Sequence, residues 1–292
     1  VAGIIPEILD LKYLYIEVNS KIYYNSNLAP SSAYVSSVVQ SNSMKYAESS
    51  EMNKYGARFK YSKFLNIIDQ SNESITSNIT TIYIRRDIRA VLNAFAEYQI
   101  GFGNEFHIKS MSGYNIKSSA FRIAGIMDDV YISDIPNTNR ISGSLFLFTV
   151  PSEASQSPTI VRRNIGTINY KEGIITINPV NIQSGMIKDG QTVIEISACP
   201  LSNDVIGLQD LYLQLDINNS TFETVVDEIS SGLDPSGSNY IISTSYANGN
   251  LVRSGGRNTQ TTTRTTSVPS TSTTTPTTSG SSTSSTSAAS SY

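Results

Sequence analysis

Apolar and polar side chains alternate strictly between Tyr13 and Tyr24. One row is apolar and consists of Leu14, Ile16, Val18, Ile22 and Tyr24. The other row holds Tyr13, Tyr15, Glu17, Asn19, Lys21 and Tyr23. Successive side chains of a strand point to opposite faces, so a period of two predicts a strand with one face in the core.

Two helices and a second strand are predicted after this strand. Ser31 or Ser32 is a predicted N-cap, and apolar residues then recur at three- and four-residue steps until Tyr55-Gly56. A second short helix is predicted from Ser62 to Gln70. The β-branched residues from Ile79 to Arg85 predict another strand. The beginning of the chain therefore reads as a strand–helix–helix–strand module.

Beyond residue 90 the helical periodicity fades, and short apolar stretches alternate with Gly, Pro, Asn and Ser. This spacing favours antiparallel strands. The clearest hairpin runs from Thr167 to Ile177, with Gly173 at the left-handed position of its loop. The predicted fold class is α+β. The predicted domains are an α+β module at residues 1–110, an antiparallel β-rich domain at 111–253, and a low-complexity tail at 254–292.

The tail contains 14 Thr and 12 Ser among 39 residues, with no acidic residue. Such a segment cannot bury enough apolar surface to offset the entropy lost on ordering. We expect it to be ordered only where it lies extended along another chain.

Composition excludes several classes of protein. The charged fraction is 15% and the net charge is -3, which gives no field for attracting nucleic acid or an anionic membrane. No apolar run approaches the roughly 18 residues needed to span a bilayer. The single cysteine, Cys199, cannot form an internal disulfide or a cysteine-based zinc site.

Several segments contain residue types that are used in catalysis or ligand binding. His107 is the only histidine and lies in no hydrolase motif. The run Gly101-Phe102-Gly103-Asn104 lacks the third glycine of a dinucleotide loop, and Asp128-Asp129 lacks calcium-loop spacing. The simpler interpretations are a structural histidine, a tight turn and a solvated loop. The sequence therefore predicts no catalytic residue, no metal ligand and no cofactor.

Tyrosine is the residue type that stands out, with 17 copies. Tyrosine covers area and keeps a hydroxyl for a partner, so it is favoured at protein interfaces. The basic doublets Arg85-Arg86 and Arg162-Arg163 fit a solvated or interface pair better than a nucleic-acid site. The predicted interface residues are Tyr13, Tyr15, Tyr23, Arg85 and Arg86. The alternative is that a second layer of the protein covers the face of the first strand that carries Tyr13, Tyr15 and Tyr23.

The segments Ile5-Pro6-Glu7-Ile8 and Tyr13–Asn25 resemble the baseplate wedge proteins of large contractile-tailed phages, relatives of the baseplate J-like family. Further stretches resemble that family in the same order: Tyr61–Phe64 with Ile68-Asp69, Ser74–Asn78, Tyr98–Asn104, Gly166–Tyr170 with Gly173–Ile175, and Ser202–Ile206. Family members are usually longer, so the chain would match their later portion. The Ser/Thr tail is not a family feature.

The resemblance implies a structural, non-enzymatic virion protein. Copies would pair through two separate surfaces into a ring around the central hub, join other wedge proteins and support the sheath indirectly, after assembly in the host cytoplasm. Two self-complementary patches suffice for such a ring. One alternative is a cell-surface or adhesive protein with the Ser/Thr tail as a glycosylated stalk. Another is a hydrolase of cell-wall glycan using His107, Asp128 and Asp129.

Overall fold

The computed structural model describes most of the chain up to Leu233 and four short strands beyond it. The described residues are 12–108, 114–150, 158–207, 211–233, 240–242, 246–247, 250–251 and 262–264. The chain divides into two compact units, residues 1–233 and 234–292, which are described separately.

The first unit is built on a seven-stranded sheet around two long antiparallel strands, β1 (Lys12–Tyr24) and β3 (Ile75–Arg89). The strand predicted over Tyr13–Tyr24 is therefore present. The other members are β12 (Met186–Lys188), β13 (Gln191–Ala198), β5 (Lys117–Ser118), β15 (Leu211–Leu215) and β16 (Thr221–Val226). β15 pairs in parallel with the first half of β1 and β16 with the second half.

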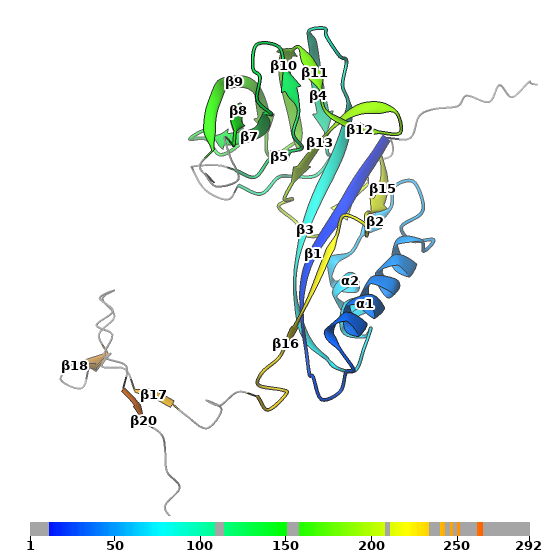
Figure 1. Cartoon of the computed structure of the whole chain (residues 1–292), viewed down its shortest axis with the longest axis vertical. Helices are drawn as coiled ribbons and strands as arrows, with labels where there is room; N and C mark the ends of the chain where they lie inside the picture. Colours follow the sequence, from blue (N-terminus) through cyan, green and yellow to red (C-terminus); the bar gives the residue numbers. More distant parts are fainter. Residues whose placement is uncertain are drawn as a thin grey trace, which may run out of the picture. The chain divides into compact units, whose positions relative to one another are not determined.

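Two helices, α1 (Ser32–Ala47) and α2 (Tyr61–Asp69), lie on one side of β1 and β3 (Figure 1). They bury the apolar row of β1, which supplies a continuous core together with residues such as Val39 and Phe64. The Ser31 side chain caps α1 by accepting from the backbone N–H of Tyr34. α1 ends well before Tyr55, and α2 begins without a side-chain cap. Between the helices, β2 (Arg58–Phe59) pairs with β14 (Val205–Ile206).

A second, fully antiparallel sheet has the order β4-β10-β9-β8-β7. Its strands are β4 (Ala96–Gly101), β7 (Tyr131–Pro136), β8 (Ser142–Thr149), β9 (Thr159–Asn169) and β10 (Ile174–Val180). The predicted hairpin is β9–β10, and Gly173 has a φ of 66° in its turn. Beside it, β6 (Arg122–Ile123) pairs with β11 (Ile182–Ser184). An apolar interior joins the two sheets, lined by Ile88, Leu147, Ile177 and Ile194 among others.

The predicted α+β fold class is wrong. Of the described residues, 51% lie in strands and 12% in helices, and these residues include two helices. The predicted strand–helix–helix–strand unit is not a separate module, because β1 and β3 share their sheet with strands from Lys117 to Val226. Local periodicity detects each element, but it carries no information on pairing between strands about 200 residues apart in sequence.

In the second unit, β17 (Tyr240–Ile242) pairs with β20 (Thr262–Arg264) and β18 (Tyr246–Ala247) with β19 (Asn250–Leu251). Apart from β20, the predicted low-complexity tail lies outside the described residues, as does its predicted contact with another chain. Among the described helices, none is long and apolar enough to cross a membrane.

Candidate assembly surface

The alternation along β1 gives the long sheet two different faces. Leu14, Ile16 and Val18 are at most 1% exposed in the core, whereas Tyr13 and Tyr15 are half-buried on the opposite side. We call this opposite side the outer face. Residues opposite one another in register share a face. The outer face therefore also carries Tyr212 opposite Tyr13, Arg85 opposite Tyr15, and Glu195 opposite Asp87.

Four tyrosines form a contiguous group on the outer face and beside it, which we call the tyrosine patch: Tyr13, Tyr15, Tyr55 and Tyr212. The Tyr13 and Tyr15 rings stack with centroids 5.7 Å apart. Tyr212 meets Tyr13 edge-on at 5.7 Å and Tyr55 at 5.6 Å. Tyr55 is 60% exposed. Such edge-to-face and offset contacts fix the rings against one another, so the patch is a preformed aromatic surface.

A buried ionic group adjoins the patch, and we call it the Arg85 cluster: Arg85, Lys188, Glu17, Asp87, Glu195 and Asp216. The Arg85 side chain is 3% exposed. Its guanidinium pairs with Glu17, with Asp87 at 3.0 Å and with Asp216 at 3.0 Å. Lys188 Nζ lies 2.7 Å from Asp87 and 3.3 Å from Glu195. One arginine thus connects β1, β3 and the end of β15.

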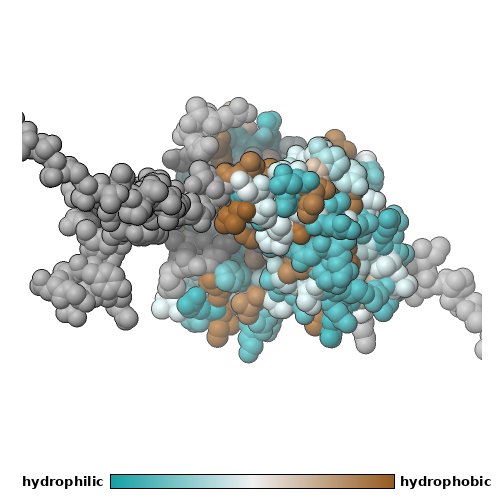
Figure 2. All heavy atoms as spheres, turned by 90° about the horizontal axis from the view of Figure 1, so that it is seen from below, coloured by the Kyte–Doolittle hydropathy of each residue, from teal (hydrophilic) through white to brown (hydrophobic). Residues whose placement is uncertain are grey.

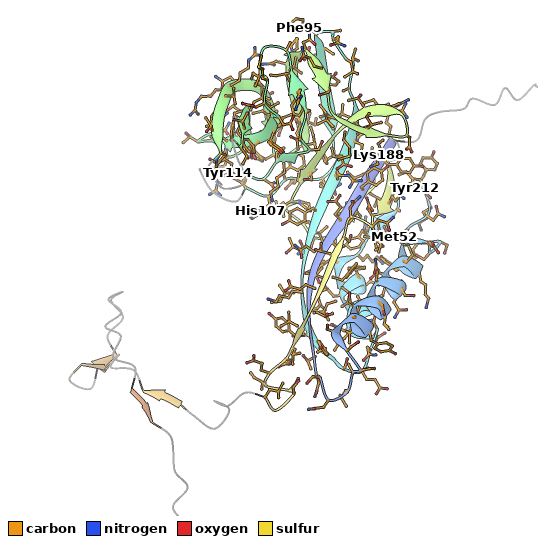
Figure 3. All side chains as sticks on the ribbon, in the orientation of Figure 1. Met52, Phe95, His107, Tyr114, Lys188 and Tyr212 are labelled. Atoms are coloured by element: carbon orange, nitrogen blue, oxygen red, sulfur yellow. The ribbon has the colours of Figure 1, made fainter. Side chains whose placement is uncertain are left out.

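The tyrosine patch and the Arg85 cluster meet at Tyr15. The Arg85 guanidinium carbon lies 4.6 Å from the centre of the Tyr15 ring, and Lys188 Nζ lies 5.3 Å from it. Both distances are within the range of cation–π attraction. Lys188 and Tyr212 occupy the same region near the start of β1 in Figure 3. The Arg85 cluster therefore lies against the Tyr15 ring and holds the tyrosine patch in place.

The pKa shifts in the cluster follow from burial and charge. Burial raises the pKa of Glu17 despite the nearby Arg85 charge. Burial also opposes ionisation of Asp216, but hydrogen bonds from Asn219 and the Arg85 charge outweigh it and lower the pKa. Burial by itself lowers the pKa of Lys188, but the hydrogen bond to Asp87 outweighs burial, and the pKa is raised. The lysine is therefore cationic at neutral pH, as the arginine is.

The structure brings together three of the five predicted interface residues. Tyr13, Tyr15 and Arg85 lie at one end of the outer face, but Arg85 already has its partners within the chain. Tyr23 lies at the other end of β1, with Lys21 Nζ 5.9 Å from its ring. Arg86 belongs to the opposite face and donates to the carbonyl of Gly101 at 2.6 Å.

Tyr212 and Tyr55 were not among the predicted residues. The alternation of Leu211, Leu213 and Leu215 in the sequence indicates that Tyr212 points away from the core. Nothing local indicates that β15 pairs with β1, nor that the loop after α1 brings Tyr55 to the same place.

The other sequence candidates do not converge on a site. His107 lies in a loop, where its backbone N–H donates to the carbonyl of Cys199 at 2.9 Å. Asp129 pairs with Arg122 at 2.7 Å on the surface. Gly103, with a φ of 65°, makes a turn after β4. In the described ranges, no group of three or more His, Cys, Asp or Glu side chains is placed to hold a metal ion.

An apolar pocket of about 450 Å³ lies on the second sheet. Tyr114, Tyr131, Phe146 and Phe148 are among its lining residues, and the Tyr131 and Phe148 rings stack at 5.5 Å. On the face presented in Figure 2, apolar residues occur in small groups between hydrophilic ones.

Comparison with known families gives one result. Residues 12–87 match the family described as baseplate structural protein gp6, C-terminal domain III. The matched range runs from the first residue of β1 almost to the end of β3, and it contains both helices. No match is found among curated proteins. The resemblance to baseplate wedge proteins is therefore confirmed for this part of the chain.

The family is one of structural proteins, and the match supports a structural role in a phage tail baseplate within the virion. It also supports association with other baseplate components. Tyr13, Tyr15, Tyr55 and Arg85 all lie inside the matched range, whereas Tyr212 lies beyond it.

Proposed function

We propose that this chain is a structural subunit of a contractile phage tail baseplate, in which copies associate through two surfaces into a ring around the central hub. The observation that carries the proposal is the match of residues 12–87 to a baseplate structural domain. That range supplies most of the tyrosine patch, which we take as the first surface. The second surface lies on the β-rich part of the chain. Other wedge proteins are direct partners, and the hub and sheath are indirect ones.

Physical chemistry supports contact through the tyrosine patch. Rigid aromatic rings bury area on binding at low entropic cost, and tyrosine is enriched in the core of interfaces. The Arg85 cluster contributes by holding the Tyr15 ring in place. We also propose that the subunit assembles in the host cytoplasm.

Native mass spectrometry and negative-stain microscopy over a range of concentrations test this function. We expect closed assemblies with one discrete copy number. The double variant Y13S/Y212S removes two patch rings and should shift the population towards smaller species. As a control, Y34S alters an exposed tyrosine of α1 outside the patch and should assemble normally. A wild-type chain that stays monomeric at the highest concentrations contradicts the proposal.

A further inference from the structure

We propose that Met127 of one copy inserts into the apolar pocket of a second copy, and that Met127 of the second copy inserts into the pocket of the first. The pocket is the one of about 450 Å³ that Tyr114, Tyr131, Phe146 and Phe148 line. This inference rests on the proposed self-association and names the residues of its second surface, on the β-rich part of the chain. The second copy is identified by the exposed methionine and by charge complementarity.

The pocket lies on the side of β8 that faces away from the core. Leu145 and Leu147 are at most 1% exposed in the core, whereas the alternate residues Phe146 and Phe148 line the pocket. The ring of Tyr114 meets Phe146 edge-on at 6.0 Å, and Tyr114 is 50% exposed. An aromatic pocket that is open to solvent in this way is typical of a binding site.

Met127 is carried by the loop between Phe121 and Val130. These two residues close the base of the loop with two backbone hydrogen bonds, 3.1 and 2.8 Å long. Arg122 pairs with Asp129 across the loop at 2.7 Å. Met127 is 94% exposed, so its side chain does not occupy the pocket of its own copy. A loop that is held at its base therefore presents an apolar side chain to the solvent.

The loop and the pocket have matching chemistry. Methionine is flexible and packs favourably against aromatic rings, so it suits a pocket of irregular shape. Asp128 follows Met127 and is exposed, and Lys117, the charged residue among the described lining residues, is exposed too. Neither Asp128 nor Lys117 makes an ion pair with another described residue. Insertion of the methionine therefore brings an unpaired carboxylate towards an unpaired lysine of the other copy.

The methionine and the pocket belong to one surface, because Tyr131 of the pocket wall follows Met127 by four positions in the sequence. A two-fold axis between two copies therefore makes the same contact twice, and like surfaces pair. Tyr114 lies on the left of the first unit in Figure 3, whereas Tyr212 of the tyrosine patch lies on the right. Two separate self-complementary surfaces allow copies to alternate around a ring.

The test measures the second surface alone, in full chains that carry Y13S/Y212S to remove the tyrosine patch and serve as the parent. Mass photometry and sedimentation of the parent should show dimers and no larger species. Adding M127S removes two inserted side chains per dimer and should lower the association affinity at least about tenfold. The control M44S changes an exposed methionine of α1 and should dimerise like the parent. Circular dichroism checks the folding of every variant.

Charge reversal tests the pairing of Asp128 with Lys117. D128K and K117D, each added to the parent, should weaken dimerisation, because each places like charges opposite one another at both contacts. The double variant D128K/K117D should recover the affinity of the parent, and so should an equimolar mixture of the two single variants. A purely structural role for either residue predicts no such recovery.

The outcomes separate the inference from the proposed function. If M127S dimerises like the parent, or if the double variant does not recover, the Met127 contact is overturned and the proposed function stands. If the parent is monomeric or forms species larger than dimers while the wild type assembles, the pocket surface does not pair with itself and the inference is wrong. If the wild type itself remains monomeric, the proposed function fails and the inference fails with it.

Discussion

Replacing Arg85 with methionine should destabilise the first unit by about 3–5 kcal/mol, the usual cost of removing one partner from a buried ion pair. The side chain is 3% exposed and makes three direct ion pairs, with a fourth carboxylate oxygen at 3.9 Å. Without the guanidinium group, Lys188 is the only cation that remains in the Arg85 cluster for its four carboxylates. Their side chains are 13–21% exposed, so partial solvation keeps the loss near the stated range.

Unfolding in urea, followed by circular dichroism and by scanning calorimetry, measures this effect. For a unit of this size the loss corresponds to a fall in Tm of roughly 6–20 °C. R85K keeps the charge without the planar fork, so it should recover only part of the loss. The control R122M breaks a pair that is about half exposed and should cost less than about 1 kcal/mol. A loss below about 1 kcal/mol for R85M would refute the view that this arginine holds the sheet together.

Four further predictions concern single residues. Burial raises the pKa of Glu17 in the folded state. The stabilising contribution of Glu17 is therefore present at low pH and is lost as the pH rises through the raised pKa. E17Q should accordingly cost less stability near pH 7 than near pH 4. Asp216 has a lowered pKa, so D216N should show the opposite trend in the same urea titrations. Y170F removes a 2.6 Å hydrogen bond to buried Asp134 and should cost about 1–3 kcal/mol, whereas the control Y131F should be near neutral. G173A should cost more than G190A in thermal melts: both glycines have positive φ, but only at Gly173 would a Cβ lie 2.1 Å from a backbone oxygen. Equal losses of stability for G173A and G190A would show that the close Cβ contact at Gly173 contributes nothing.

The sequence predicted local elements more reliably than their assembly. The alternation from Tyr13 to Tyr24 predicted β1, and the Gly173 hairpin is present with its left-handed glycine. Both rest on interactions between residues near in sequence. The α+β class is wrong because the described residues are mostly in strands, and β1 pairs with β15 and β16 through contacts that no local pattern encodes.

The tyrosine patch, too, was predicted from the sequence only in part. Alternation placed Tyr13 and Tyr15 on one face, and the structure confirms that placement. It also separates Arg85 from Arg86, because neighbouring residues of a strand point to opposite faces. Their contribution to an interface stays a prediction.

By itself, the sequence determined that β1 has an apolar row and a tyrosine row, because side-chain direction along a strand depends only on backbone geometry. The folded structure brings Tyr212 and Tyr55 next to Tyr13 and places Arg85 among carboxylates from distant strands. These groups meet because strands far apart in the chain pair side by side, and pairing at that separation is set by the packing of the whole unit.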